Sequence, residues 1–209
     1  MKLSDCLLFA TITVTAFHCK SKDTNDIPEE PAVRPPVIAH PSPQQLSPEE
    51  SMKAMHLPKG YKVELVASEP MIEEPVAIEW DANGRLYVAE MVSYMQDING
   101  TNENEPISKI VRLEDTDGDG KMDKQTVFID SVVLPRMTLA LDDRLIVAET
   151  YSSNLYSYRD TNNDGIADEK IQVYHDDTKD TRNLEHQRSG LVWDLDNWIY
   201  TSRQLRYKW

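Results

Sequence analysis

The sequence WDANGRLYVAEM at residues 80–91 returns as LDDRLIVAET at residues 141–150, and this repeat decides the fold. The shared part is Arg-Leu-x-Val-Ala-Glu, which begins at Arg85 in the first copy and at Arg144 in the second. A looser third copy, WDLDNWIYTS, follows at residues 193–202. Self-similarity over a period of this length indicates an array of structural units.

Each of the first two copies predicts four short antiparallel strands, which are runs of Val, Ile, Leu and Tyr bounded by Asp, Asn and Gly. Four-stranded units in series are typical of β-propeller blades. A two-sheet sandwich also has many short strands, but it does not repeat one four-strand pattern with the same turn in the same place. The predicted strands lie near 76–80, 85–90, 109–113 and 125–129 in the first unit, and near 137–141, 144–149, 154–158 and 169–174 in the second.

The predicted fold class is therefore all-β, an incomplete β-propeller preceded by a short helix and a disordered tether. Propellers close with about four to eight blades, whereas residues 47–209 supply about two and a half. We expect this region to be the N-terminal part of a longer propeller.

The N-terminus predicts export. Lys2 precedes the apolar run CLLFATITVTAF at residues 6–17, which is short for a membrane span and suits a signal peptide. Residues 1–19 are therefore interpreted as a signal, with Cys19 as a lipidation site. The expected location is the periplasm, the outer membrane as a lipoprotein, or the cell surface, with a membrane contacted only through this lipid or signal anchor.

A proline-rich stretch at residues 20–46 follows the signal and predicts an extended, disordered tether. A helix is expected next in SPEESMKAMHL, with Ser47 as its N-cap, Pro48 at its first position and Glu50 completing a capping box. Leu57 to Gly60 are expected to end this helix.

The composition excludes several classes of protein. The chain of 209 residues has a formal net charge of −14 and a pI of about 4.7, which argues against nucleic acid as a partner and suits cations. Its two cysteines, Cys6 and Cys19, both lie in the predicted signal. The predicted propeller therefore has no disulfide, thiolate zinc site or thiol nucleophile.

Two acidic loops join the last two predicted strands of each unit. Both follow the opening of an EF-hand calcium loop, in which oxygen ligands stand at positions 1, 3, 5 and 9, a glycine at 6 and a backbone carbonyl at 7. The bidentate acid of position 12 is missing, because Thr126 and Ile171 stand there. The same residue types are also standard in tight turns, but two matching copies favour calcium. The candidate ligands are Asp115, Asp117, Asp119, Lys121 and Asp123 in the first loop, and Asp160, Asn162, Asp164, Ile166 and Asp168 in the second.

Residues 47–91, RLEDTDGDGKMDKQTVFID at 112–130 and NLEHQRSGLVWDLDNWIYTS at 183–202 resemble one family. It comprises the exported membrane-bound dehydrogenase-type propellers, also described as PVC-type haem-binding proteins, which are related to sorbosone and soluble glucose dehydrogenases. The resemblance implies a six-bladed ring, pyrroloquinoline quinone as cofactor, and a sugar or polyol as substrate. It also implies an electron acceptor or cytochrome domain as partner, with haem c only in a missing C-terminal region.

The resemblance further implies a general base. EHQ at residues 185–187 is similar to the acid-His-Gln segment of those enzymes, which makes His186 the base with Glu185 before it. An imidazole is well suited to take a hydroxyl proton near neutral pH. The sequence departs from the pattern where an aspartate is expected to orient the base, because Leu205 stands there. A loop histidine that is only hydrogen-bonded at the propeller mouth is the alternative interpretation of His186.

Two functional hypotheses follow. The first is an exported quinoprotein-type dehydrogenase that oxidises a sugar or polyol hydroxyl, of which this chain is an N-terminal part without activity of its own. The second is a non-catalytic, calcium-stabilised propeller that binds glycans or partner proteins at the cell surface.

Overall fold

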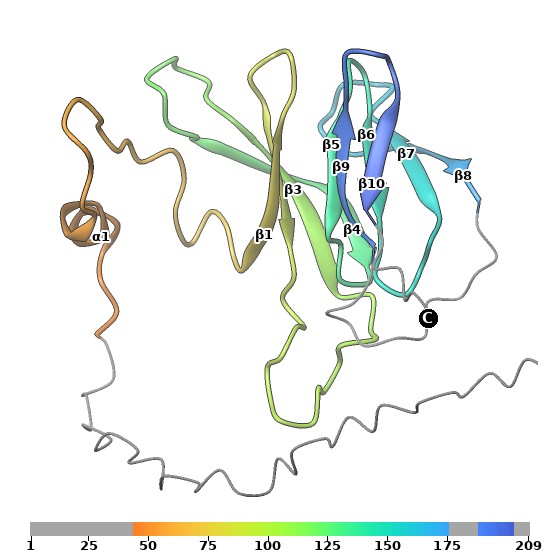
Figure 1. The fold of residues 1–209 in the computed structure, drawn as a ribbon, viewed down its shortest axis with the longest axis horizontal. Helices are drawn as coiled ribbons and strands as arrows, with labels where there is room; N and C mark the ends of the chain where they lie inside the picture. The colour runs from red at the N-terminus through yellow and green to blue at the C-terminus, as the bar shows by residue number, and fades with distance from the viewer. Residues whose placement is uncertain (1–43, 176–187, 203–209) are drawn as a thin grey trace, which may run out of the picture. The chain divides into compact units, whose positions relative to one another are not determined.

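The computed structural model of the chain describes residues 44–175 and 188–202 (Figure 1). The chain divides into two compact units, Met1–Gln45 and Leu46–Trp209, and all elements described here lie in the second. No helix in these described ranges is long and apolar enough to cross a membrane. The predicted signal with Cys19, most of the predicted tether, and the predicted base His186 with Glu185 lie outside the described residues.

The short helix α1 (Pro48–Ala54) begins as predicted. Ser47 Oγ accepts a hydrogen bond from Glu50 N at 3.2 Å, and the Glu50 carboxylate accepts one from Ser47 N at 2.9 Å. This confirms the capping box. The helix ends at Ala54, earlier than the predicted stop at residues 57–60. It has no buried residue, and a helix without a packed face is marginal at this length.

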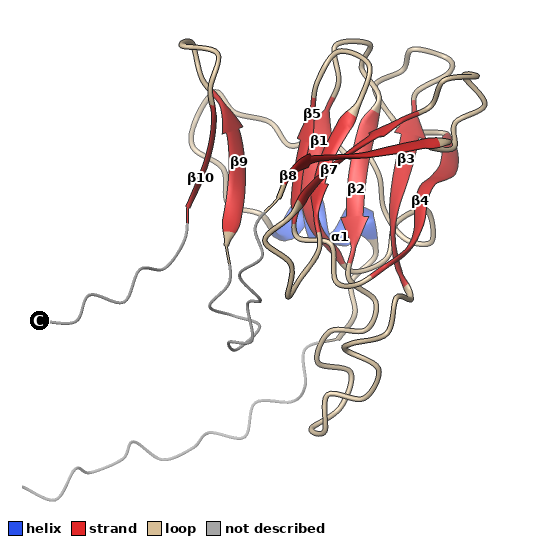
Figure 2. Cartoon of the chain, turned by 90° about the vertical axis from the view of Figure 1, so that its right-hand side faces the viewer, coloured by secondary structure: helices blue, strands red, loops and turns tan. Residues whose placement is uncertain are grey.

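Two four-stranded antiparallel sheets follow, each with its strands in sequential order, and a two-stranded sheet comes after them (Figure 2). All eight predicted strands are confirmed. The largest difference is at the end of β4, which is three residues longer than predicted. The strands are β1 (Pro75–Trp80), β2 (Leu86–Glu90), β3 (Ser108–Glu114) and β4 (Lys124–Val132), then β5 (Met137–Ala140), β6 (Leu145–Ala148), β7 (Leu155–Arg159) and β8 (Glu169–Tyr174), then β9 (Ser189–Trp193) and β10 (Ile199–Ser202).

The first hairpin of each unit is closed by the same backbone hydrogen bond. Asp81 N donates to Arg85 O at 3.0 Å, Leu141 N to Arg144 O at 2.9 Å, and Asp194 N to Trp198 O at 3.0 Å. The third copy is therefore a true repeat of the first two.

The units are arranged as propeller blades. We name residues 75–132 blade 1, residues 137–174 blade 2, and the start of the next unit, β9 and β10, blade 3. The first strands lie next to one another, since β1 contacts β5 and β5 contacts β9. Blades 1 and 2 share one hydrophobic core, in which Ile110 and Phe128 of blade 1 lie with Leu145 and Val147 of blade 2. The described fold is an incomplete β-propeller, with its innermost strands at one side.

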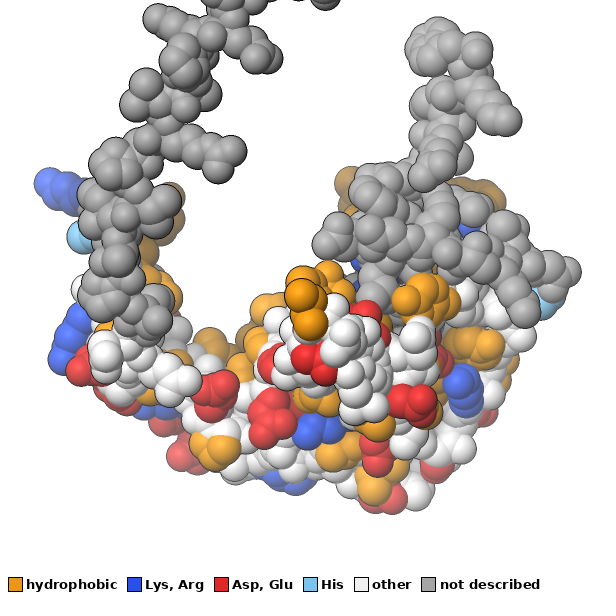
Figure 3. Space-filling view, turned by 90° about the horizontal axis from the view of Figure 1, so that it is seen from below, with side chains coloured by type: hydrophobic (Ala, Val, Ile, Leu, Met, Phe, Trp, Pro, Cys, Tyr) orange, Lys and Arg blue, Asp and Glu red, His pale blue; other side chains and the backbone are white. Residues whose placement is uncertain are grey.

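Acidic residues outnumber basic ones in the sequence, with 36 Asp and Glu against 22 Lys and Arg. On the face seen from below they are spread among hydrophobic side chains and form no single patch (Figure 3).

Candidate calcium loops and an axial cavity

The first acidic loop (residues 115–123) joins β3 to β4 and is folded around Asp115. The Asp115 carboxylate accepts hydrogen bonds from Gly118 N at 2.7 Å and from Gly120 N at 2.8 Å. These backbone donors, Gly120 first, lower the pKa of Asp115. The carboxylate is therefore charged at neutral pH and faces the inside of its own turn.

Three carboxylates of this loop gather closely enough to share a metal ion. Oxygen atoms of Asp115, Asp117 and Asp123 all lie within 4.8 Å of one another, a spacing that suits calcium with oxygen ligands at about 2.3–2.6 Å. Asp119 is outside this group, and its Oδ1 accepts a hydrogen bond from Lys121 N at 2.8 Å. Three of the four predicted side-chain ligands thus come together.

The second acidic loop (residues 160–168) joins β7 to β8 and repeats this turn. Asp160 Oδ2 accepts a hydrogen bond from Gly165 N at 2.8 Å. Asp168 accepts from Thr161 N and Oγ1 at 3.0 and 2.8 Å, and these bonds lower its pKa. The remaining predicted ligands, Asn162 and Asp164, are hydrogen-bonded within the turn, and Ile166 N donates to Asp164 Oδ1. The second loop forms no such three-carboxylate group among the described residues.

A buried arginine distinguishes the second loop from the first. Arg112 of β3 places Nη1 3.0 Å from Asp160 Oδ2, and the two side chains are only 4% and 7% exposed. The guanidinium also lies so close to Gly165 that a Cβ there would meet Arg112 Nη2 at 2.8 Å. The charge that a metal ion would supply at Asp160 therefore comes from the neighbouring blade.

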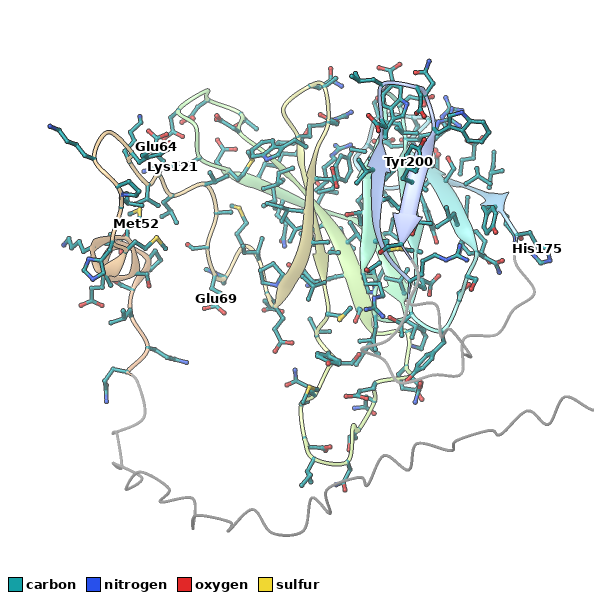
Figure 4. The ribbon with its side chains drawn as sticks, viewed as in Figure 1. Met52, Glu64, Glu69, Lys121, His175 and Tyr200 are labelled. Carbon is teal, nitrogen blue, oxygen red and sulfur yellow. The ribbon has the colours of Figure 1, made fainter. Side chains whose placement is uncertain are left out.

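Each loop also forms a backbone hydrogen bond to the part of the chain that precedes its own blade. Ala167 N donates to Phe128 O in β4 at 2.9 Å, and Met122 N donates to Val66 O at 2.8 Å. Lys121 and Glu64 are accordingly drawn together in Figure 4. The loops therefore fix the contact between neighbouring units as well as their own turns.

A cavity of about 260 Å³ lies where the innermost strands of the three units begin. We call it the axial cavity. Arg136, the residue before β5, lines it, and so does Ser189, the first residue of β9. The other lining residues come from β1, from the segment before β5 and from the loops after β2 and β6; they are Val76, Leu134, Met91, Tyr94 and Thr150.

The glutamates that end the repeat bind the backbone of the segment that leads into the first strand of blades 1 and 2. Glu90 Oε1 accepts a hydrogen bond from Glu73 N at 2.9 Å, ahead of β1, and Glu149 Oε2 accepts one from Val133 N at 2.9 Å, ahead of β5. Thr150 Oγ1 adds a hydrogen bond to Leu134 O at 2.8 Å. Their repetition thus reflects a shared structural role beside the axial cavity.

Two residues of these sites were missed from the sequence alone. Arg112 was visible as a basic residue inside the apolar strand SKIVRLE, a pattern that indicates a buried partner. Arg136 had no comparable signal. The predicted base His186 with Glu185, and Leu205, lie outside the described residues. His175, which directly follows β8, is exposed.

Two successive blades and the first two strands of a third define this chain as part of a β-propeller protein. The family described as a domain of unknown function, DUF7133, matches residues 47–207, and the chain belongs to that family. No curated protein matches the chain. An X-ray structure reported as a candidate gluconolactonase is similar, with 20% identity and a TM-score of 0.45. That match covers 66% of this chain and 44% of the other, so this chain spans less than half of that protein's length.

Proposed function

We propose that this chain is the N-terminal part of an exported quinoprotein-type dehydrogenase that oxidises a sugar or polyol hydroxyl at the axial cavity. The observation that carries the proposal is the position of Ser189, which lines that cavity at the start of β9. His186 precedes Ser189 by three residues.

The role assigned to His186 is to accept the hydroxyl proton, with Glu185 beside it. Pyrroloquinoline quinone, when bound, would accept the hydride from the alcohol carbon. Arg136 lines the same cavity, and arginine is a residue type that binds the carboxylates of such a cofactor well. The other basic residues that hold the cofactor are expected in later blades, and haem c with the electron acceptor in a further C-terminal region.

Loss of the base is expected to abolish turnover. In the natural protein with its further blades and added pyrroloquinoline quinone, His186→Ala should lower dye reduction with aldoses or polyols by roughly 10²–10⁴-fold, the usual contribution of a general base. His175→Ala is the matched control, since His175 is exposed at the end of β8 (Figure 4). Unchanged activity of the His186→Ala protein would contradict the assignment.

We also propose that the acidic loops bind calcium, the first loop more tightly than the second. The gathered carboxylates of Asp115, Asp117 and Asp123 support the first site. Arg112 already neutralises Asp160 in the second loop, which leaves less charge there to attract a cation. With few carboxylate ligands, both sites are expected to have the affinity of extracellular modules, about 10⁻⁴–10⁻³ M.

Calcium at millimolar concentration is expected to raise the melting temperature of the chain, because a ligand that binds only the folded state stabilises it. At about ten times the dissociation constant the gain is roughly 1.4 kcal/mol, or about 3–6 °C for a chain of this size. Asp117→Asn should remove most of this shift, whereas Asp142→Asn, on an exposed turn, should keep it. An absence of calcium heat in calorimetry, together with an unchanged melt, would rule out the sites.

The calcium loops favour a second candidate function, which is a non-catalytic propeller that binds glycans or partner proteins at the cell surface. Its supporting observation is that both loops stabilise turns and blade contacts, while none of their residues is among the described residues that line the axial cavity. A natural protein that binds calcium and never reduces dye after reconstitution would select this function.

The remaining assignments follow from the leading function. Export through residues 1–19, lipidation at Cys19 and the Pro-rich tether at residues 20–46 would place the propeller in the periplasm, on the outer membrane or at the cell surface. Metabolic labelling with a fatty acid, lost on Cys19→Ser, would report the lipid directly.

A further inference from the structure

One side of blade 1 lacks the cover that its other side has. Ala77 of β1 packs into the core shared with blade 2. Two residues of the same strand, Ile78 and Trp80, are 57% and 48% exposed. They pair with Val88 and Leu86 of β2, and because successive side chains of a strand point to opposite faces, they form an apolar pair on the side away from blade 2.

The outer part of that same side is covered by the segment at residues 61–68, ahead of blade 1. Val66 and Ala67 pack against a core formed by Leu86, Val88 and Leu113, with other residues of blade 1. The segment alternates apolar and charged residues in KVEL at residues 62–65, the pattern of a half-buried strand. It covers β2 and β3 of blade 1 and leaves Ile78 and Trp80 of β1 exposed.

The backbone contact of this segment matches the contact of an outermost strand. Between blades 1 and 2, Ala167 N donates to Phe128 O of β4, the fourth strand of blade 1. At the other side of blade 1, Met122 N donates to Val66 O. Met122 and Ala167 hold the same position, the eighth, in their acidic loops. Val66 therefore stands where Phe128 stands, in the fourth strand of a preceding blade.

We propose that residues 61–68 are the outermost strand of the blade that closes the ring, and that its three inner strands come from later in the same polypeptide. Those inner strands would pair with the backbone edge of residues 61–68 and cover Ile78 and Trp80 of β1. A closed ring removes both exposed edges and apolar faces. The strand expected to pair with residues 61–68 is thus the third strand of the closing blade, with alternating apolar and polar residues.

Two proline substitutions test this pairing. Backbone N–H groups alternate in direction along a strand, and proline has none. Of two neighbouring residues, only one directs its N–H toward the third strand of the closing blade. One of Val63→Pro and Glu64→Pro therefore removes a hydrogen bond to that strand. In the natural protein with its further blades, one of the two should lower the melting temperature by roughly 5–10 °C. In the 209-residue chain, whose described strands include no partner for that edge, neither should.

Hydrogen exchange gives a second readout. Amides of residues 61–68 should exchange slowly in the natural protein and fast in the 209-residue chain. Equal effects of proline in both proteins, or none in either, would overturn the proposal. The proposal would also be overturned if the natural protein had no further blades. If the melting temperature of the 209-residue chain depends on protein concentration, and the proline substitutions remove that dependence, the edge of residues 61–68 pairs with a second copy of the chain instead.

Discussion

Replacing Arg112 with methionine is expected to destabilise the chain by about 3–5 kcal/mol, the usual cost of removing one partner of a buried ion pair. The guanidinium lies 3.0 Å from Asp160 Oδ2, and neither side chain is more than 7% exposed. Without Arg112, Asp160 keeps its charge in a site that water barely reaches. The residual hydrogen bonds from Asp164 N and Gly165 N cannot replace a full charge.

The effect should reach the contact between blades 1 and 2, because Arg112 belongs to β3 and Asp160 to the second acidic loop. Arg112→Met with Asp160→Asn should recover part of the loss, since the double variant has no unpaired charge. It should also weaken calcium binding at the second loop, as Asn lacks the charge of Asp.

Urea denaturation of the two single variants and the double variant measures these terms. Arg144→Met is the matched control. Arg144 pairs with Asp143 at 2.7 Å, but both side chains are about one-third exposed or more, at 34% and 43%. An exposed pair of this kind contributes about 0–1 kcal/mol. Equal losses for Arg112→Met and Arg144→Met would contradict the role assigned to the buried pair.

Replacing Glu90 with alanine is expected to cost about 2–4 kcal/mol, from a lost charged hydrogen bond and a lost ion pair. Glu90 is fully buried, binds Glu73 N at 2.9 Å and lies 3.2 Å from Lys109 Nζ. The contact with Lys109 is an ion pair without hydrogen-bond geometry. Lys109 is 29% exposed and can turn to solvent, which keeps the cost below that of Arg112→Met.

The repeat itself supplies the control, because Glu149 occupies the equivalent position in blade 2. Its side chain is 21% exposed and lies 3.8 Å from Lys170 Nζ, so Glu149→Ala should cost about 1 kcal/mol. Thermal and urea melts of the two variants compare the same substitution at two depths of burial. A larger loss at Glu149 would show that burial does not set the cost.

The local patterns were predictable from the sequence. Strand positions follow from alternating apolar runs and turn residues, as at Leu86–Glu90 and Leu145–Ala148. The cap at Ser47 needs only its neighbours, and so do the turns of the acidic loops around Asp115 and Asp160. These interactions join residues close in sequence, so their residue types suffice to predict them. The prediction for His186 stays a prediction, since it lies outside the described residues.

Residue types along the chain were enough to predict a serial array of four-stranded units with a repeated acidic turn. The difference between the two turns becomes visible only in the folded chain, because Arg112 and Asp160 are 48 residues apart. The same holds for the packing of residues 61–68 on blade 1 and for the cavity that Val76, Arg136 and Ser189 line together. Propensities and turn rules act between neighbours along the chain, whereas these contacts depend on how the blades pack against each other.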